Sequence, residues 1–313
     1  MPVAGFIKSG SIPFAIIILG ISHITTQIAV IREFINIFSG NEIVLGIIIS
    51  LWLLLSEIGA WLGRFLENPR WHMPLFHIII YPVAFLPIVI ILLIRFLSNQ
   101  MLIRGELPGI GILIPWTSML LISYCIHTGM LLTLASSVLE SPGKESSGMG
   151  REYFLDNVGD IMGGILFTFI LSRYLDNLTV LYVPALLCLF AFLALTSLRT
   201  AQGLFFYLLG MAELVALIVV SFFIRLGDFS LTWLYPEQII VTHSESPYGR
   251  LVVTRTGDQI SFFENGELLF STPHTFANKE LVHFALPQRK DAGNILLVSG
   301  GMAGVIDEIM KYP

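Results

Sequence analysis

The sequence is poor in charged residues. Only 12% of its 313 residues are Asp, Glu, Lys or Arg, whereas 55% are hydrophobic and the mean hydropathy is +0.81. A soluble globular protein carries about 25% charged residues, so the composition excludes a wholly soluble globular protein. It predicts an integral membrane protein whose principal partner is the lipid bilayer.

Basic residues are scarce even in the polar part of the chain. Residues 228–313 contain six Lys or Arg and ten Asp or Glu, which gives a net charge of about −4. Nucleic-acid binding requires a basic patch, so we exclude nucleic acid as a partner.

Cysteine is almost absent as well. Cys125 and Cys188 lie in apolar runs and have no metal-ligating residue at a useful spacing. This pattern is typical of buried thiols and indicates no metal site.

Long apolar runs fill residues 1–227, which we assign to a multi-helix transmembrane domain. A spanning helix needs about 20 predominantly apolar residues. Seven segments qualify: 12–38, 42–66, 74–97, 109–139, 152–174, 177–198 and 203–226. We expect an α-helical membrane bundle of about seven helices, with the fourth tilted or broken near Pro115.

The charges in the connecting loops do not decide the orientation, because both sides carry similar numbers of Lys and Arg. We expect the plasma (inner) membrane, with the polar segment in the cytoplasm where nucleotide-type ligands are found.

Several ionisable residues interrupt the apolar runs, which is costly in a membrane. They are His23, Arg32, Glu33, Glu57, His127, Asp156, Asp160 and Glu213. Asp156, Gly159, Asp160 and Gly163 share one stripe of the fifth helix. Gly59 and Gly63 repeat the small-residue spacing beside Glu57.

Two interpretations of these polar residues stay open. In the first, the glycines allow close helix packing and the acids pair with Arg32 or share protons. In the second, Asp156, Asp160, Glu57 and Glu213 line a polar cavity for a cation or a cationic substrate.

The pattern changes to short strands after about residue 228. Strands are predicted at 238–242, 251–255, 259–264 and 267–271, with a Thr-Gly-Asp turn and an Asn265-Gly266 hairpin between the last three. We expect a small antiparallel β meander over 228–275.

The last segment, 276–313, is predicted to contain a helix at 276–286, a strand at 295–298, a glycine turn at 299–304 and a helix at 305–312. A strand that runs through a glycine turn into a helix is how a nucleotide-binding α/β domain begins, because the free N–H groups of the helix face the ligand.

In order, the soluble segment contains SPYGR, the ENG hairpin, STP, KELVHFAL, the glycine cluster and DEIMKYP. This series resembles the spermidine synthase family, and specifically its membrane-fused, polyamine aminopropyltransferase-type members. The Asp- and Gly-rich fifth helix and the charged first helix are similar in style to the membrane half of that family.

The resemblance implies a β domain, used for homo-oligomer contacts, followed by a Rossmann-like methyltransferase-type fold. It also implies aminopropyl transfer in polyamine biosynthesis. Decarboxylated S-adenosylmethionine, or S-adenosylmethionine, would be a co-substrate rather than a tightly bound cofactor, and putrescine the acceptor. Because the attacking amine must be deprotonated, carboxylates are the natural residues for this chemistry. No metal is implied.

Three motifs of the family align with this sequence. Its Gly-Gly-Gly-Asp-Gly-Gly run aligns with residues 299–304, where Gly300, Gly301 and Gly304 match and Ser299 stands for the first glycine. Its Gln-Tyr-Gly-Arg aligns with residues 247–250 and retains Tyr248. Its Tyr-His-Glu aligns with residues 278–280 and retains Glu280.

The resemblance therefore implies a nucleotide site at Ser299, Gly300, Gly301 and Gly304, with Tyr248 and Glu280 as further contacts. Tyr248 can also be read as a packing aromatic of the meander, and Glu280 with His283 as a surface pair. No catalytic residue is assigned. The ribose-binding carboxylate of such a site, about 20 residues past the turn, would fall after Pro313, so we expect a chain truncated early in the Rossmann-like domain and inactive alone.

The leading hypothesis is a membrane-bound, spermidine synthase-like protein that binds an S-adenosylmethionine-type nucleotide and transfers an aminopropyl group to putrescine. The alternative is a membrane transporter of cations or polyamines whose soluble segment serves only for oligomerisation or regulation. A protein that uses the nucleotide fold only to bind a partner is a third possibility.

Overall fold

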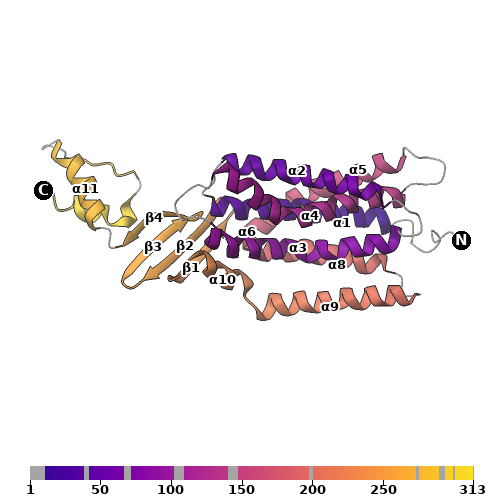
Figure 1. Cartoon of the computed structure of the whole chain (residues 1–313). Helices are drawn as coiled ribbons and strands as arrows, with labels where there is room; N and C mark the ends of the chain where they lie inside the picture. The colour runs from indigo at the N-terminus through magenta and orange to yellow at the C-terminus, as the bar shows by residue number, and fades with distance from the viewer. Residues whose placement is uncertain are drawn as a thin grey trace.

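The computed structural model describes residues 11–38, 42–66, 72–101, 109–139, 147–196, 200–272, 275–288, 293–298 and 300–312. A helical bundle is followed by a small antiparallel sheet at one of its ends, and the last helices lie beyond that sheet (Figure 1). The first described residues, from residue 11 onward, lie at the opposite end of the bundle.

Seven helices in this part of the chain are long and apolar enough to cross a membrane. The bundle consists of α1 (Ser11–Ile37), α2 (Glu42–Arg64), α3 (His72–Met101), α4 (Ile110–Leu139), α5 (Ser147–Leu166), η2 (Phe167–Leu171), α6 (Ser172–Tyr174), α7 (Asn177–Val180), α8 (Tyr182–Leu195) and α9 (Ala201–Phe223). The predicted count of seven long apolar helices is confirmed.

Three predicted helices differ in detail. The fourth is not broken at Pro115, because α4 continues through it. The fifth changes to a π-helical turn at Phe167–Leu171 before α6. The sixth begins as the short α7, in which the side chain of Asp176 accepts a hydrogen bond from the Thr179 N–H and so caps the first turn.

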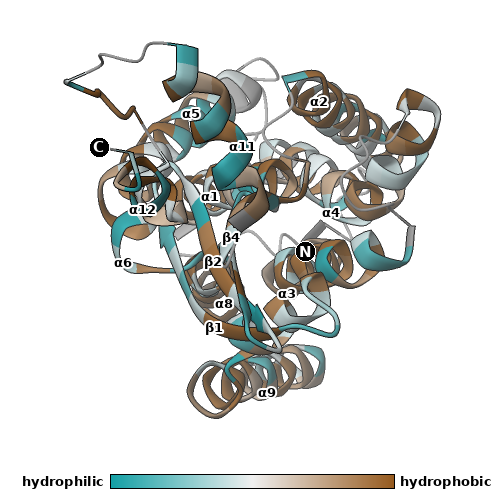
Figure 2. Cartoon of the chain, turned by 90° about the vertical axis from the view of Figure 1, so that its left-hand side faces the viewer, coloured by the Kyte–Doolittle hydropathy of each residue, from teal (hydrophilic) through white to brown (hydrophobic). Residues whose placement is uncertain are grey.

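Apolar residues are exposed on the bundle as well as buried in it, and most of the ribbon of its helices is coloured as hydrophobic in Figure 2. On α2, Leu53, Leu54 and Trp61 are exposed, and on α9 so are Phe222 and Phe223. A helix that is apolar all round belongs in a membrane or in the core of a large protein.

The bundle joins the sheet through α10 (Leu226–Leu231) and η3 (Thr232–Leu234), which cross the predicted boundary at residue 228. Leu231 and Tyr235 pack with Val252 of the sheet into a small core. The sheet is a meander in the order β1 (Ile239–Ser246), β2 (Gly249–Thr256), β3 (Gln259–Glu264) and β4 (Glu267–Thr272). The four predicted strands are therefore confirmed.

The hairpin between β3 and β4 turns at Asn265 and Gly266, whose φ angles are both positive (49° and 81°). Two central residues with positive φ define the turn that matches the twist of the strands, which is why Asn-Gly favours hairpins. Gly266 lies against the end of α1: a Cβ there would come within 2.7 Å of the Asn36 carbonyl oxygen.

After β4 come α11 (Thr275–Ala285), η4 (Leu286–Gln288), η5 (Gly301–Ala303) and α12 (Val305–Ile309). The predicted strand at 295–298 is wrong, since this segment has no regular structure. A strand exists only when another strand supplies hydrogen-bond partners, and none of the described segments pairs with it. The described residues from 276 onward therefore contain α11, a glycine turn and the short α12, and no parallel sheet.

Candidate functional site

A buried cluster of charges joins the bundle to the sheet. The carboxylate of Glu33 on α1 is fully buried and accepts two hydrogen bonds from Arg95 of α3, at 2.7 and 3.2 Å. It accepts two more from Arg250 of β2, at 3.1 and 2.8 Å. Paired donation by an arginine to a carboxylate is stronger than a neutral hydrogen bond and fixes the relative orientation of the two groups.

Polar groups from the connecting helices complete this cluster. Arg95 also donates to the carbonyl of Gly227 and the hydroxyl of Ser230. The side chain of Asn177 donates to Glu33 at 2.8 Å, and its backbone N–H donates to Glu245 at 2.6 Å. We call Glu33, Arg95, Asn177, Ser230, Glu245 and Arg250 the junction network.

Arg250 is held firmly in its charged form. Burial by itself would lower its pKa, but the charges of Glu33 and Glu245, together with the hydrogen bonds to both, raise it above the ordinary arginine value. Its Nε donates to Glu245 at 2.6 Å. The network therefore contains permanent charges, which a buried site tolerates only while every partner is present.

Arg32, the neighbour of Glu33 on α1, does not pair with the acids of the fifth helix. Its guanidinium donates to the carbonyl oxygen of Ser246 at 2.6 Å and lies 5.6 Å from the ring centre of Phe167. The predicted packing interpretation is wrong on this point: Arg32 secures the β1–β2 turn to the bundle.

The Tyr-Gly-Arg segment of that turn has two opposite environments. Tyr248 is 93% exposed, whereas Arg250 is buried in the junction network. The Arg250 N–H donates to the side-chain oxygen of Asn265 at 2.9 Å, which ties the turn to the β3–β4 hairpin. In this structure the segment therefore fastens the sheet to the bundle, and the Tyr248 ring makes no buried contact.

The glycine turn lies at the far end of the soluble segment. Gly300 and Gly304 have φ angles of 82° and 89°, which only glycine adopts without strain. The Asn278 side chain of α11 donates to the Ala303 carbonyl at 2.5 Å and supports the turn from below. Gly301 begins the 3-10 turn between them, and Ser299 lies outside the described residues.

The side chains around the turn are mostly exposed. Glu280 faces solvent on α11, and Met302 is exposed where the family motif has an aspartate. His283 hydrogen-bonds the Tyr312 hydroxyl rather than Glu280, so the predicted surface pair of Glu280 with His283 is not what holds this helix. Helix α12, which packs on α11, is stabilised by Lys311, whose ammonium donates to Glu308 at 2.5 Å.

The structure does not bring Tyr248 and the glycine turn together. The β1–β2 turn contacts α1 at the bundle end of the sheet. The β3–β4 turn lies beside α1 at Gly266. Strand β4 then runs away from the bundle, and α11 follows beyond the far end of the sheet (Figure 1). Tyr248 is therefore at the end of the sheet that faces the bundle. The other predicted nucleotide contacts lie beyond the opposite end of the sheet: Gly300, Gly301, Gly304 and Glu280.

The four carboxylates predicted to line one cavity within the apolar helices occupy separate places. Asp156 lines a cavity of about 80 Å³ that is enclosed by residues of all five helices from α1 to α5. Asp160, one turn further along α5, has its Oδ1 4.0 Å from the Nδ1 atom of His23. Glu57 is exposed on the outside of α2, and Glu213 lies on α9 near Tyr81 and Cys188. The four predicted acids therefore do not form one site.

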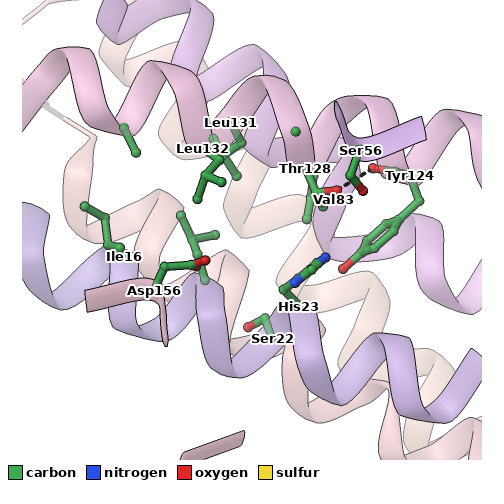
Figure 3. Close-up of a pocket in the computed structure, with 13 residues that line it drawn as sticks. Ile16, Ser22, His23, Ser56, Val83, Tyr124, Thr128, Leu131, Leu132 and Asp156 are labelled. Carbon is green, nitrogen blue, oxygen red and sulfur yellow. Dashed lines mark hydrogen bonds between the residues drawn. The ribbon is translucent and has the colours of Figure 1, made fainter. Parts of the chain in front are cut away.

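Figure 3 shows the cavity, with the Asp156 carboxylate and the His23 ring facing its interior and Tyr124 beside His23. Its lining combines hydroxyl groups with aliphatic walls. The lining residues are Ile16, Leu19, Ser22, His23, Ser56, Val83, Tyr124, Thr128, Gly129, Leu131, Leu132, Ala135 and Asp156.

The glycines of these helices serve close packing, as one interpretation predicted. A Cβ on Gly20 would lie 2.5 Å from the Asp156 carbonyl oxygen, and one on Gly159 would collide with the Ile17 carbonyl. On α2, a Cβ at Gly59 would lie 2.5 Å from the Ile126 carbonyl of α4. Small residues at these positions let the two helix pairs approach backbone to backbone.

Sequence reasoning missed several members of these sites. Arg95 is the one arginine within the apolar run 74–97, and that isolation was a usable signal. Glu152 precedes Asp156 by four residues and so continues the stripe on α5. Asn177 and Glu245 carried no comparable signal, because their partners lie far away in the sequence.

Curated proteins similar to this chain are all named polyamine aminopropyltransferases. Polyamine aminopropyltransferases 1 and 2 of Ralstonia nicotianae are each 39% identical over 90 residues, which is 28% of this chain and 17% and 18% of theirs. The protein from Leptospira interrogans is 24% identical over 283 residues, which is 85% of this chain and 52% of its own length.

These identities are low. The chain spans about half the length of the relatives that match over most of it, and 18% of the length of a relative that matches only 90 residues. A match over 85% of the chain must nevertheless include apolar helices as well as part of the segment after them. No family model matches the chain. No solved structure matches it either.

Proposed function

We propose that this chain belongs to an integral membrane protein of the polyamine aminopropyltransferase type. The observation that carries the proposal is the agreement between the ordered motifs of the soluble segment and the names of the similar proteins. Those names give no support to the alternative of a cation or polyamine transporter.

Membrane insertion is supported by the lengths and surfaces of the helices. A helix of 23 residues such as α2 or α9 is about 35 Å long, enough to cross a hydrocarbon core of about 30 Å. Their exposed Leu, Trp and Phe side chains would be costly in water and suit a lipid environment. The sheet and α11 would then lie on one side of the membrane. We assign this side to the cytoplasmic face of the plasma (inner) membrane.

The glycine turn is the proposed binding place of the S-adenosylmethionine-type nucleotide. Gly300 and Gly304 are left-handed, a backbone geometry in which successive N–H groups can form an anion-binding turn, although the Ala303 N–H already donates to the Gly300 carbonyl at 3.1 Å. Asp307 and Glu280 are exposed carboxylates on the two flanking helices, and the side-chain oxygen of Asp307 lies 4.0 Å from the position of a Cβ on Gly304. Carboxylates at this place would hold a cationic co-substrate or amine.

In the proposed reaction, the amine nitrogen of a polyamine precursor forms a bond to the aminopropyl carbon next to the sulfonium of decarboxylated S-adenosylmethionine. The carbon–sulfur bond breaks, its electron pair neutralises the sulfur, and the nitrogen loses a proton. The part of the protein is to bind both cations, to align them and to favour the deprotonated amine.

Titration calorimetry of the purified full-length protein in detergent tests this function. We expect saturable heat with decarboxylated S-adenosylmethionine or S-adenosylmethionine, and a loss of at least tenfold in affinity for Gly304→Val. Valine is strained at φ 89°, and its Cβ would lie 3.1 Å from the Asn278 Nδ2. The matched control is Gly293→Ala, which meets no atom within 4 Å. Absence of heat with both nucleotides would refute the proposal.

A further inference from the structure

Three carboxylates follow one another along α5 at intervals of four residues. Glu152, Asp156 and Asp160 therefore lie on the same face of the helix, with successive Cα atoms about 6 Å apart along its axis. This face is turned toward α1, because Gly159 and Gly163 on it touch Ile17 and Ile21. We call these three residues the carboxylate row.

The row has no basic partner in the described part of the chain. Glu152 is only 4% exposed, and its Oε1 is buried without a hydrogen-bond partner there. The Oδ1 of Asp160 is likewise buried and without a hydrogen bond, although its side chain as a whole is 32% exposed. No described Lys or Arg forms an ion pair with any of the three.

The nearest candidate cation, His23, is held in its neutral form. The indole N–H of Trp52 donates to His23 Nε2 at 3.2 Å. An indole nitrogen can only donate, so Nε2 carries no proton and the single ring proton is on Nδ1. The His23 Nδ1 atom lies 4.0 Å from Asp160 Oδ1, too far for a direct hydrogen bond. His23 therefore orients the site without neutralising it.

Unpaired carboxylates among membrane helices are expensive, and such groups usually have a partner or a bound ion. The cavity beside Asp156 provides space for one. Its volume of about 80 Å³ is about half that of a cavity that holds benzene, which is too small for a nucleoside. It suffices for an ammonium group and the methylenes next to it.

The walls of the cavity match such a group. Ser56, Thr128 and Tyr124 place oxygens at the end near His23, where they can accept hydrogen bonds from an ammonium (Figure 3). Ile16, Leu131 and Leu132 supply an aliphatic wall at the other end. An inorganic ion would gain nothing from that wall, whereas an alkyl chain would bury apolar surface against it.

We propose that the carboxylate row and this cavity form a second binding site, within the membrane helices, for an aliphatic diamine. One ammonium pairs with Asp156, which lines the cavity, and the other pairs with Asp160, four residues further along the row. The spacing of one helical step of four residues is close to the distance between the amino groups of a four- or five-carbon diamine. The recognition of an alkylammonium follows from the contacts above, and the choice of a polyamine precursor rests on the proposed function.

Equilibrium binding of radiolabelled 1,4-diaminobutane to the full-length protein in lipid nanodiscs tests this site. We expect saturable binding, a loss of at least tenfold in affinity for Asp156→Asn and for Asp160→Asn, and no change for Glu57→Gln. Glu57 is the matched control because it is an exposed carboxylate of the same bundle outside the cavity. Butylamine, with one ammonium, should compete at least tenfold more weakly. Equal competition by butylamine or by sodium would overturn the proposal.

A second measurement uses the wild-type chain, in case the variants do not fold. An apolar carbodiimide should label carboxyl groups of the row, and 1,4-diaminobutane should reduce labelling of Asp156 and Asp160, but not of Glu57, in peptide mass spectra. Unchanged labelling would overturn the proposal.

Failure of the second site can be distinguished from failure of the proposed function. If diamine binding survives in Asp156→Asn/Asp160→Asn and is lost in Glu280→Gln, the amine binds only in the soluble segment and the second site is refuted. If the row variants lose diamine binding while no S-adenosyl nucleotide binds any form of the protein, the second site stands and the proposed function falls.

Discussion

The two ends of the soluble segment are built in opposite ways. At the end next to the bundle, Glu33, Arg95 and Arg250 are 0%, 1% and 3% exposed and every charge has at least one partner. At the far end, Leu296 and Val298 are 89% and 81% exposed. The side-chain hydrogen bonds of its described residues include those from Asn278 to Ala303, between His283 and Tyr312, and from Lys311 to Glu308.

The comparison indicates that the sheet is an adaptor. The sheet is joined to the helical bundle by a buried ionic network, and at its far end it is followed by a glycine turn within an apolar, exposed surface. The positions that would bind a nucleotide are therefore kept away from the bundle, whereas the segment that contains Arg250 is committed to the junction. Three perturbations of the two ends sharpen this contrast.

The largest effect is expected for Glu33→Gln at the junction. It leaves the charges of Arg95 and Arg250 buried with only Glu245 to balance them, and loss of one partner from a buried ionic cluster costs about 3–5 kcal/mol. Unfolding of the detergent-solubilised protein by increasing SDS, followed by tryptophan fluorescence, measures this. Glu57→Gln is the control. A difference from the control below about 1 kcal/mol would show that the network does not hold the junction.

An intermediate effect is expected from the two turn glycines of the sheet. Gly266→Ala meets both a positive φ and the Asn36 carbonyl at 2.7 Å, whereas Gly257→Ala at φ 60° meets no atom within 4 Å. The left-handed conformation alone costs about 1–2 kcal/mol. We expect Gly266→Ala to be the more destabilising of the two in the same unfolding experiment. Equal losses would mean that the β3–β4 turn is not pressed against α1.

The smallest effect is expected from acid at the far end. The hydrogen bond and the charge of Lys311 lower the pKa of Glu308. A carboxyl whose folded pKa is depressed stabilises the fold above its unfolded pKa and loses that contribution as the pH falls through the folded value. Hydrogen exchange of α12 should therefore increase as the pH falls below about 4, after correction for the intrinsic rate. The increase should be absent in Glu308→Gln; its persistence in that variant would assign it to another group.

Much of the fold could be predicted from local patterns. Apolar runs of about 20 residues gave the long helices, and Asn265-Gly266 gave the hairpin, because one residue pair determines that turn. The strand at 295–298 could not be predicted correctly in the same way. Its apolar residues satisfy the pattern of a buried strand, but pairing depends on a neighbour, and no described segment provides one.

The candidate sites were less accessible to sequence reasoning. The four-residue spacing predicted that Asp156 and Asp160 share a stripe of the helix with two glycines, and only the structure shows that this stripe faces α1. The partners of Glu33 could not be inferred, because Arg250 lies 217 positions away. Charge alone also misassigned Arg32, which binds a backbone carbonyl of the sheet instead of a membrane acid.

The most direct test of the account is an assay of aminopropyl transfer by the full-length protein in lipid nanodiscs. Decarboxylated S-adenosylmethionine labelled in the aminopropyl group would be incubated with 1,4-diaminobutane and the products separated by chromatography. The account predicts a labelled triamine that is lost in Gly304→Val and retained in Gly293→Ala. No labelled triamine from the wild-type protein, with or without added diamine, would contradict it.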